Sequence, residues 1–253
     1  MAQSPPEKLF DAGMKAATTL TAALLALAIP CAAAVPVAPQ GVSASYDMYR
    51  NGLHIAVINE TFEAKGGGYQ LASVTRTIGL FALVERQSLL FTSTGRLADA
   101  GLQPLHFEGK RGDADPRQVR ADFDWQAGQL TIVHDGKTDT FPLAPATQDR
   151  VSLMYQFMFM EADKLPRIEF AMTNGRKLDR YRYTVTPGVE IDTPMGRMTT
   201  LHLVKQHKPD ESGAEVWLSP QHRYLPVRVL VVEENGTRFE QFITRLDIKE
   251  FQP

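Results

Sequence analysis

Cysteine is almost absent from this sequence of 253 residues. The one cysteine, Cys31, lies near the N-terminus, so a chain cleaved after Ala34 would contain no thiol. Such a chain can form no disulfide bond and no zinc–thiolate site, and it has no thiol nucleophile. We therefore expect a fold that is stabilised by core burial and by sheet hydrogen bonds.

A strong net charge is also absent. The formal net charge is -2 and the pI is near 6.3. Proteins that bind nucleic acid usually carry a basic excess, and a polybasic segment usually marks attraction to anionic lipid. The sequence has neither feature, so we expect no nucleic-acid partner.

The N-terminal residues have the features of an export signal. Lys15 precedes an apolar run over residues 16–29, Pro30 ends that run, and the alanines at 32–34 offer a cleavage site. The run is short for a membrane span. Because Ile29 and Pro30 precede Cys31, cleavage is favoured over lipidation of this cysteine.

These features predict a domain organisation and a location. We expect a signal peptide over residues 1–34 with the true start at Met14, an extended tail over 35–42, and a single β-rich domain over 43–253. The mature protein is then periplasmic, has no transmembrane segment and is expected to be a monomer.

Short strands separated by turn residues fill the chain after residue 43. Three hairpin signals are the pairs Asn51-Gly52, Asn174-Gly175 and Asn235-Gly236, because these residue types tolerate positive φ. Turn signals recur about every ten residues, which is typical of an antiparallel sheet that curls on itself. The pattern predicts a mainly β protein.

One segment interrupts the strand pattern. Residues 151–162 are predicted to form a helix, with Thr147 as its N-cap and Asp149 placed favourably at its positive end. Apolar residues cover most of its circumference, which is typical of a buried helix. We expect this helix to lie inside the curved sheet.

Several segments together resemble the exported bacterial family known as domain of unknown function 3108. The resemblance lies in residues 93–96, 101–104, 122–125, 148–153, 215–220 and 224–228. The family has no agreed activity. Its architecture is similar to half-barrel carriers of the LolA/LolB kind, which implies a curled antiparallel sheet wrapped around one central apolar helix, beside an apolar cavity.

No motif in the sequence points to catalysis. The six histidines show no HExxH spacing, and neither Gly-x-Ser-x-Gly nor Ser-x-x-Lys is present as an active-site pattern. Ser152 is expected to bond its own backbone. A glycosidase needs two carboxylates at a defined distance, and the sequence does not identify such a pair among the acidic residues of the strands. We therefore predict no catalytic residue, no metal and no cofactor.

A methionine-rich run within the predicted helix is the best indication of function, because methionine surfaces adapt to varied apolar partners. Arg150 either holds the helix to the sheet or meets an anionic ligand group. A second apolar stretch, residues 78–84, could form a cavity lip or a helical turn. The candidate ligand-binding residues are Arg150, Met154, Phe157, Met158, Leu80 and Phe81.

The leading interpretation is non-catalytic binding of an apolar or amphipathic envelope ligand, such as a lipid, an acyl chain or a lipoprotein segment. Two alternatives remain open. One is a periplasmic enzyme that acts on envelope glycans. The other is a structural envelope protein whose barrel is fully packed, with the methionines filling gaps in the core.

Overall fold

The computed structural model describes residues 37–84, 88–112, 118–208 and 211–251. The expected signal peptide and the alternative start at Met14 lie outside these residues. Strand β1 (Gly41–Arg50) includes the last two residues of the expected tail, 41 and 42. None of the helices in the described part of the chain is long and apolar enough to cross a lipid bilayer.

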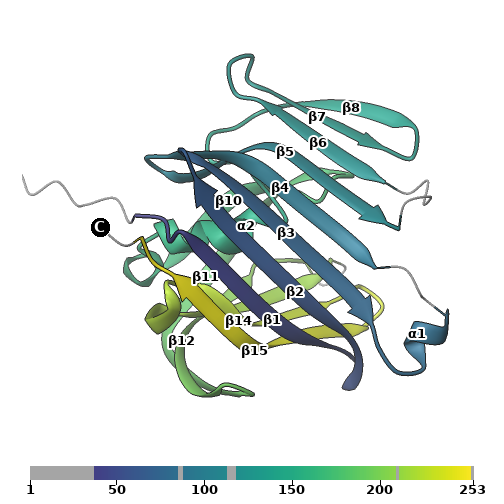
Figure 1. The fold of residues 1–253 in the computed structure, drawn as a ribbon, viewed down its shortest axis with the longest axis vertical. Coiled ribbons are helices and arrows are strands. Elements are labelled where there is room, and N and C mark those ends of the chain that lie inside the picture. The colour runs from purple at the N-terminus through teal and green to yellow at the C-terminus, as the bar shows by residue number, and fades with distance from the viewer. Residues whose placement is uncertain (1–36, 85–87, 113–117, 209–210, 252–253) are drawn as a thin grey trace, which may run out of the picture. The chain divides into compact units, whose positions relative to one another are not determined.

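The described chain forms one sheet of 15 strands (Figure 1). After β1, the strands are β2 (Leu53–Lys65), β3 (Gly68–Thr77), β4 (Leu89–Ala98), β5 (Gly101–Arg111), β6 (Val119–Asp124), β7 (Gln129–His134), β8 (Lys137–Pro142), β9 (Gln148–Asp149), β10 (Arg167–Thr173), β11 (Leu178–Thr193), β12 (Gly196–Lys205), β13 (Gly213–Ser219), β14 (Leu225–Val232) and β15 (Arg238–Lys249). The α-helices are α1 (Phe81–Val84) and α2 (Ser152–Gln156), and the 3₁₀ turns are η1 (Phe157–Phe159), η2 (Ala162–Lys164) and η3 (Pro220–His222).

The first and last strands of the chain are neighbours in the middle of the sheet. The order is β8-β7-β6-β5-β4-β3-β2-β1-β15-β14-β13-β12-β11-β10-β9, so the two halves of the chain extend the sheet in opposite directions. Neighbouring strands are antiparallel, except that β9 and β10 run parallel. The two edges are therefore β8 and β9.

The curl of the sheet brings the β9 edge back onto the first half. The Gln148 side-chain amide donates to the carbonyl of Leu102 on β5 at 2.9 Å. The Leu102 N–H in turn donates to Oε1 of Gln156 in α2 at 2.7 Å. These are side-chain bonds and not a ladder between β5 and β9, so the sheet is curled but not closed.

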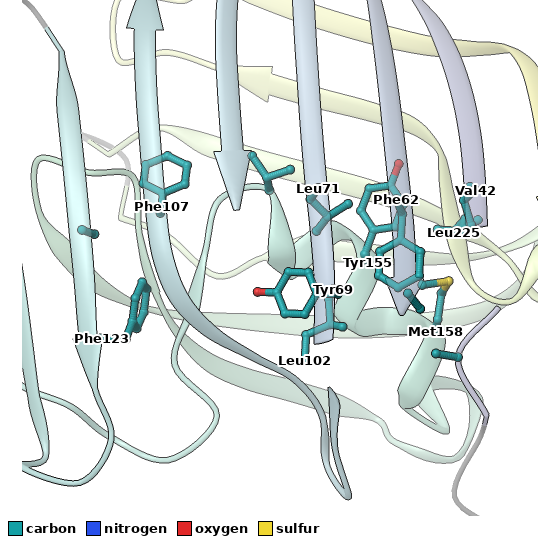
Figure 2. Close-up of a cluster of buried hydrophobic side chains, with 14 of the residues drawn as sticks. Val42, Phe62, Tyr69, Leu71, Leu102, Phe107, Phe123, Tyr155, Met158 and Leu225 are labelled. Carbon is teal, nitrogen blue, oxygen red and sulfur yellow. The ribbon is translucent and has the colours of Figure 1, made fainter. Parts of the chain in front are cut away.

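A short helical segment, residues 151–159, packs against both halves of the sheet. Val151, Tyr155 and Met158 belong to a buried cluster with β2, β3 and β5 residues, which Figure 2 shows around Phe62 and Leu71. Leu153 and Phe157 belong to a second cluster formed with residues of β10, β11, β12 and β13. A third cluster joins β1, β2 and β15 to residues of β11, β12, β13 and β14.

The predicted helix over residues 151–162 is wrong in its extent. The α-helix ends at Gln156, the 3₁₀ turn η1 follows, and Met160 is extended with φ −108° and ψ 139°. The structure therefore contains a short helical segment where one helix was expected. The apolar residues of this segment indicate that it is buried on most sides. Burial alone does not distinguish a helix from an irregular buried segment.

The predicted N-cap at Thr147 is also wrong. The Thr147 hydroxyl donates to the carbonyl of Ala144 at 2.7 Å. Oδ1 of Asp149 instead accepts the N–H groups of Val151 and Ser152, each at 2.9 Å. Asp149 thus satisfies two of the donors that the first turn of a helix leaves free.

Candidate functional site

Asp149 holds the start of the helical segment to the sheet. Its side chain is completely buried. Besides the two backbone N–H groups, it accepts the hydroxyl of Ser93 on β4 at 2.5 Å, and Ser93 also contacts the Tyr69 hydroxyl at 3.0 Å. Burial raises the pKa of Asp149, while the hydrogen bonds from Ser93, Ser152 and Val151 act in the opposite direction. This carboxylate is therefore fully engaged in structure.

Arg150, the next residue, is placed quite differently. Its side chain is exposed to solvent, although the protein around it lowers the pKa of the guanidinium by burial. The negative charges of Glu60 and Asp149 oppose that shift. Within the described chain the guanidinium forms no ion pair and no side-chain hydrogen bond. It lies over the ring of Phe91 on β4, 4.4 Å from the ring centre.

Arg150 lines a pocket of about 280 Å³, which we call the basic pocket. It lies between β4, β5 and β6 of the first half and the β10–β11 turn of the second half. None of the described residues that line it is a carboxylate. The lining consists of Leu89, Phe91, Gly109, Lys110, Arg111, Val119, Arg150, Asn174 and Arg176. The basic pocket thus combines four cationic side chains with an apolar floor.

Two glycines allow the walls of the basic pocket to approach each other. A Cβ atom on Gly109 would lie 2.5 Å from a ring carbon of Phe91, and one on Gly175 would lie 2.6 Å from a methyl group of Val119. Gly175 also has φ +86°, which L side chains rarely adopt. The expected turn at Asn174-Gly175 therefore brings the β10–β11 turn against β6.

Glu60 of β2 is an acidic residue whose charge acts on Arg150. Its carboxylate accepts the hydroxyl of Ser73 at 2.9 Å and that of Tyr155 in α2 at 3.2 Å. Burial raises the pKa of Glu60, and these two hydrogen bonds and the charge of Arg150 oppose the rise. Glu60 influences Arg150 through space without forming an ion pair with it.

The sequence candidates separate into core and accessible residues. Phe157 is 1% exposed and Met158 is 3% exposed, so both are packed in the core. Met154 is half-buried and contacts both the first and the second cluster. Arg150 lines the basic pocket, whereas Met154, Phe157 and Met158 are not among its lining residues.

Leu80 and Phe81 lie apart from the basic pocket lining, in the connection between β3 and β4. Leu80 is 80% exposed and Phe81 is 37% exposed. The short helix α1 begins at Phe81, so this stretch forms a helical turn, one of the two forms expected for it (Figure 1). Leu53, at the start of β2, is exposed at the same end of the strands.

Sequence reasoning missed three of the four cations of the basic pocket: Lys110, Arg111 and Arg176. Lys110 and Arg111 end β5, and Arg176 lies in the turn after β10. Arg176 pairs with Asp135, and this interaction lowers the pKa of Asp135. The pairing of β4 with β5 places Leu89 opposite Arg111 and Phe91 opposite Gly109. A correct prediction of this register would have placed Arg111 beside the apolar residues of the pocket.

Two serines, Ser152 and Ser219, are buried and have polar contacts within the protein. The Ser152 hydroxyl donates to the backbone carbonyl of Asp149 at 3.2 Å, as the sequence predicted. Ser219 lies 2.8 Å from Nδ1 of His222, but it is completely buried and so not accessible to a substrate. No group of three or more potential metal ligands is present among the residues that the structure describes.

Two solved structures match this chain over most of its length. A β-barrel-like protein of the domain of unknown function DUF1849 from Brucella abortus is 12% identical, with a TM-score of 0.53, over 85% of this chain and 100% of that chain. A putative outer membrane lipoprotein-sorting protein domain from Vibrio parahaemolyticus is 9% identical, with a TM-score of 0.25, over 84% of this chain and 87% of that chain.

The first of these likenesses supports the curled, barrel-like β fold. No curated protein matches the chain. The family model described as "Protein of unknown function (DUF3108)" matches residues 45–244, which is most of the chain. The chain therefore belongs to the DUF3108 family of proteins of unknown function.

Proposed function

We propose that this protein is a non-catalytic, periplasmic binding protein for an amphipathic envelope ligand, such as a lipid, an acyl chain or a lipoprotein segment. The ligand's anionic group would lie against Arg150. The observation that carries the proposal is the placement of this arginine, which is solvent-accessible in a basic pocket and has no ion-pair partner in the described chain.

The chemistry of the pocket fits an amphipathic molecule. Ligand sites typically combine an apolar lining with a few placed polar groups. Leu89, Phe91 and Val119 supply the apolar floor, and Arg150 supplies a planar cation with five N–H donors. A guanidinium partly removed from bulk water attracts an anion more strongly than an exposed surface arginine does.

A fluorescent fatty acid tests this proposal. The wild-type protein should bind it in the native state, and Arg150→Gln should weaken binding by about tenfold, since one lost charged contact is worth roughly 1.5 kcal/mol. A neutral probe of equal chain length should be affected much less. If the wild type binds neither probe, the packed structural alternative replaces the carrier.

Arg197→Gln provides a matched control for charge. Arg197 is an exposed arginine of β12 that pairs with Asp192 at 3.0 Å. It lies near the β11–β12 turn, away from the basic pocket lining. Its substitution should leave the affinity for both probes unchanged, because an exposed ion pair contributes little. An equal loss in both variants would mean that the effect is nonspecific.

The periplasmic location has its own test. The proposed signal over residues 1–34 predicts that the exported protein begins near Val35 and that a start at Met14 supports export equally well. N-terminal sequencing of the exported protein measures this directly. An intact Met1 in the mature form, or a diacylated Cys31, would contradict it.

A further inference from the structure

The number of cations at the basic pocket exceeds what a single carboxylate can neutralise. Lys110 and Arg150 both line the pocket, and neither has an ion-pair partner within the described chain. Arg111 adds a third positive side chain to the lining. Arg176 is a fourth, already paired with Asp135. A ligand with one negative charge would leave at least one of the two unpaired cations without a counter-charge.

The orientation of Arg150 leaves its donors available. A guanidinium that lies over an aromatic ring is held through its face, at 4.4 Å from the centre of Phe91. Its N–H groups lie in the guanidinium plane, and within the described chain none of them donates to another residue. The N–H groups along the edge of the guanidinium can therefore donate hydrogen bonds to a group that has several acceptor oxygens.

Two described acids act on Arg150, Glu60 and Asp149, and both are bonded to other groups. The carboxylate of Glu60 is bonded to the hydroxyls of Ser73 and Tyr155, and that of Asp149 is bonded to Ser93 and to two backbone N–H groups. Both acids act on Arg150 only through space. Within the described chain, these two acids are therefore engaged with other groups, whereas Arg150 and Lys110 have no ion-pair partner.

We infer that the basic pocket binds a phosphate group carried on an apolar body, with Arg150 and Lys110 as its principal cationic contacts. This inference rests on the proposed function and specifies its ligand class. A phosphate monoester carries about −1.5 to −2 charges near pH 7 and presents three acceptor oxygens. One such group compensates two cations, whereas a carboxylate compensates one. The apolar floor of Leu89, Phe91 and Val119 then faces the attached chain.

Isothermal titration at pH 7.5 with four probes tests the inference. The probes are dodecyl phosphate, dodecanoate, dodecanol and inorganic phosphate, all at one ionic strength. The two amphiphilic anions are kept below their micelle concentrations, and dodecanol is kept below its solubility limit. We expect dodecyl phosphate to bind at least tenfold more tightly than dodecanoate. Dodecanol and inorganic phosphate should both bind more weakly than dodecyl phosphate, because each lacks one half of the ligand.

Substitutions test which residues bind the phosphate group. In Arg150→Gln and in Lys110→Gln the preference for dodecyl phosphate over dodecanoate should fall to about threefold or less. In Arg197→Gln it should remain at the wild-type value. Unchanged melting temperatures in the Lys110 and Arg197 variants would show that the loss is not one of folding, since both side chains are outside the core clusters.

Each other result has a distinct meaning. Equal affinity for dodecyl phosphate and dodecanoate overturns the phosphate inference but leaves the proposed function intact. If inorganic phosphate binds as tightly as dodecyl phosphate, the pocket recognises phosphate, but the inference that the phosphate is carried on an apolar body is overturned. Failure of all four probes overturns both the inference and the proposed function.

Discussion

Asp149 and Arg150 are consecutive residues with opposite surroundings. The carboxylate of Asp149 is completely buried and accepts hydrogen bonds from Ser93, Val151 and Ser152. Arg150 is an exposed residue, and its guanidinium contacts the face of Phe91. A buried charge without hydrogen bonds is costly, so the satisfied acid belongs to the structure. The accessible cation is the group available for binding.

The same contrast holds for the regions around the two residues. On the side of Asp149, the helical segment joins two core clusters and presents almost no surface. On the side of Arg150, the basic pocket is lined by two cations, Arg150 and Lys110, that have no ion-pair partner in the described chain. Mutual repulsion of like charges is unfavourable, and a bound anion relieves it. The comparison therefore predicts that substitutions on the first side change stability and those on the second change binding.

The largest stability effect is expected on the packed side. Phe157→Ala should lower the free energy of unfolding by about 3–5 kcal/mol, because the ring is buried in the second cluster and meets Phe170 edge to face. Phe81→Ala, in the exposed connection, should cost less than about 1 kcal/mol. Urea unfolding measures both. Similar losses in the two variants would contradict the assignment of one to the core and the other to the surface.

Removal of the anchor should have the next largest effect. Asp149→Ala leaves the N–H groups of Val151 and Ser152 and the hydroxyl of Ser93 without their acceptor. Each buried unsatisfied group costs about 1–3 kcal/mol, so we expect a loss of about 2–4 kcal/mol after relaxation. Asp149→Asn keeps one acceptor oxygen and should lose less. A loss below 1 kcal/mol in the alanine variant would show that Asp149 does not hold the segment in place.

A pH-dependent effect is expected from Glu60, between the two regions. Its folded pKa is raised by burial above the ordinary value near 4.5, so over this interval the folded protein binds more protons than the unfolded chain. The contribution of Glu60 to stability therefore falls as pH rises from 4.5 to the raised pKa and is constant above it. Glu60→Gln should remove this decrease. Chemical denaturation across this pH range compares the two proteins, and identical profiles would contradict the raised pKa.

The smallest expected effect is a gain in binding. Asp135 pairs with Arg176 at the edge of the basic pocket. Asp135→Asn should free Arg176 to contact a bound anion and so tighten dodecyl phosphate binding about two- to fivefold, the range of an exposed charge pair. Titration calorimetry at low salt measures the gain, and 0.5 M salt should suppress it. Weaker binding in this variant would mean that Arg176 needs Asp135 for its position.

The hairpins and the strand pattern could be read from the sequence because they are local. Asn51 and Gly52 have φ of 49° and 82°, as the turn signal requires. The edge strand β8, which the sequence analysis did not predict, has exposed polar residues on both faces and so lacks the alternation that marks a half-buried strand. Local sequence thus predicts a strand when one of its faces is buried. It predicts a turn when the turn needs residues that tolerate positive φ.

The basic pocket could be predicted only in part. Arg150 was a candidate because a charged residue stood before an apolar segment. Lys110 and Arg176 lie far from it in sequence, and the curl of the sheet and the register of β4 with β5 bring them together. Phe157 and Met158 were candidates for the opposite reason, since an apolar side chain looks the same in a core as on a cavity wall.

Native mass spectrometry of protein purified from periplasmic extract tests the central claim most directly. If Arg150 holds the anionic group of an envelope ligand, the wild-type protein should carry a noncovalent ligand mass, and Arg150→Gln should carry much less of it. Arg197→Gln should carry as much as the wild type. An equal ligand load in the Arg150 variant, or no ligand on any of the three proteins, would contradict the account.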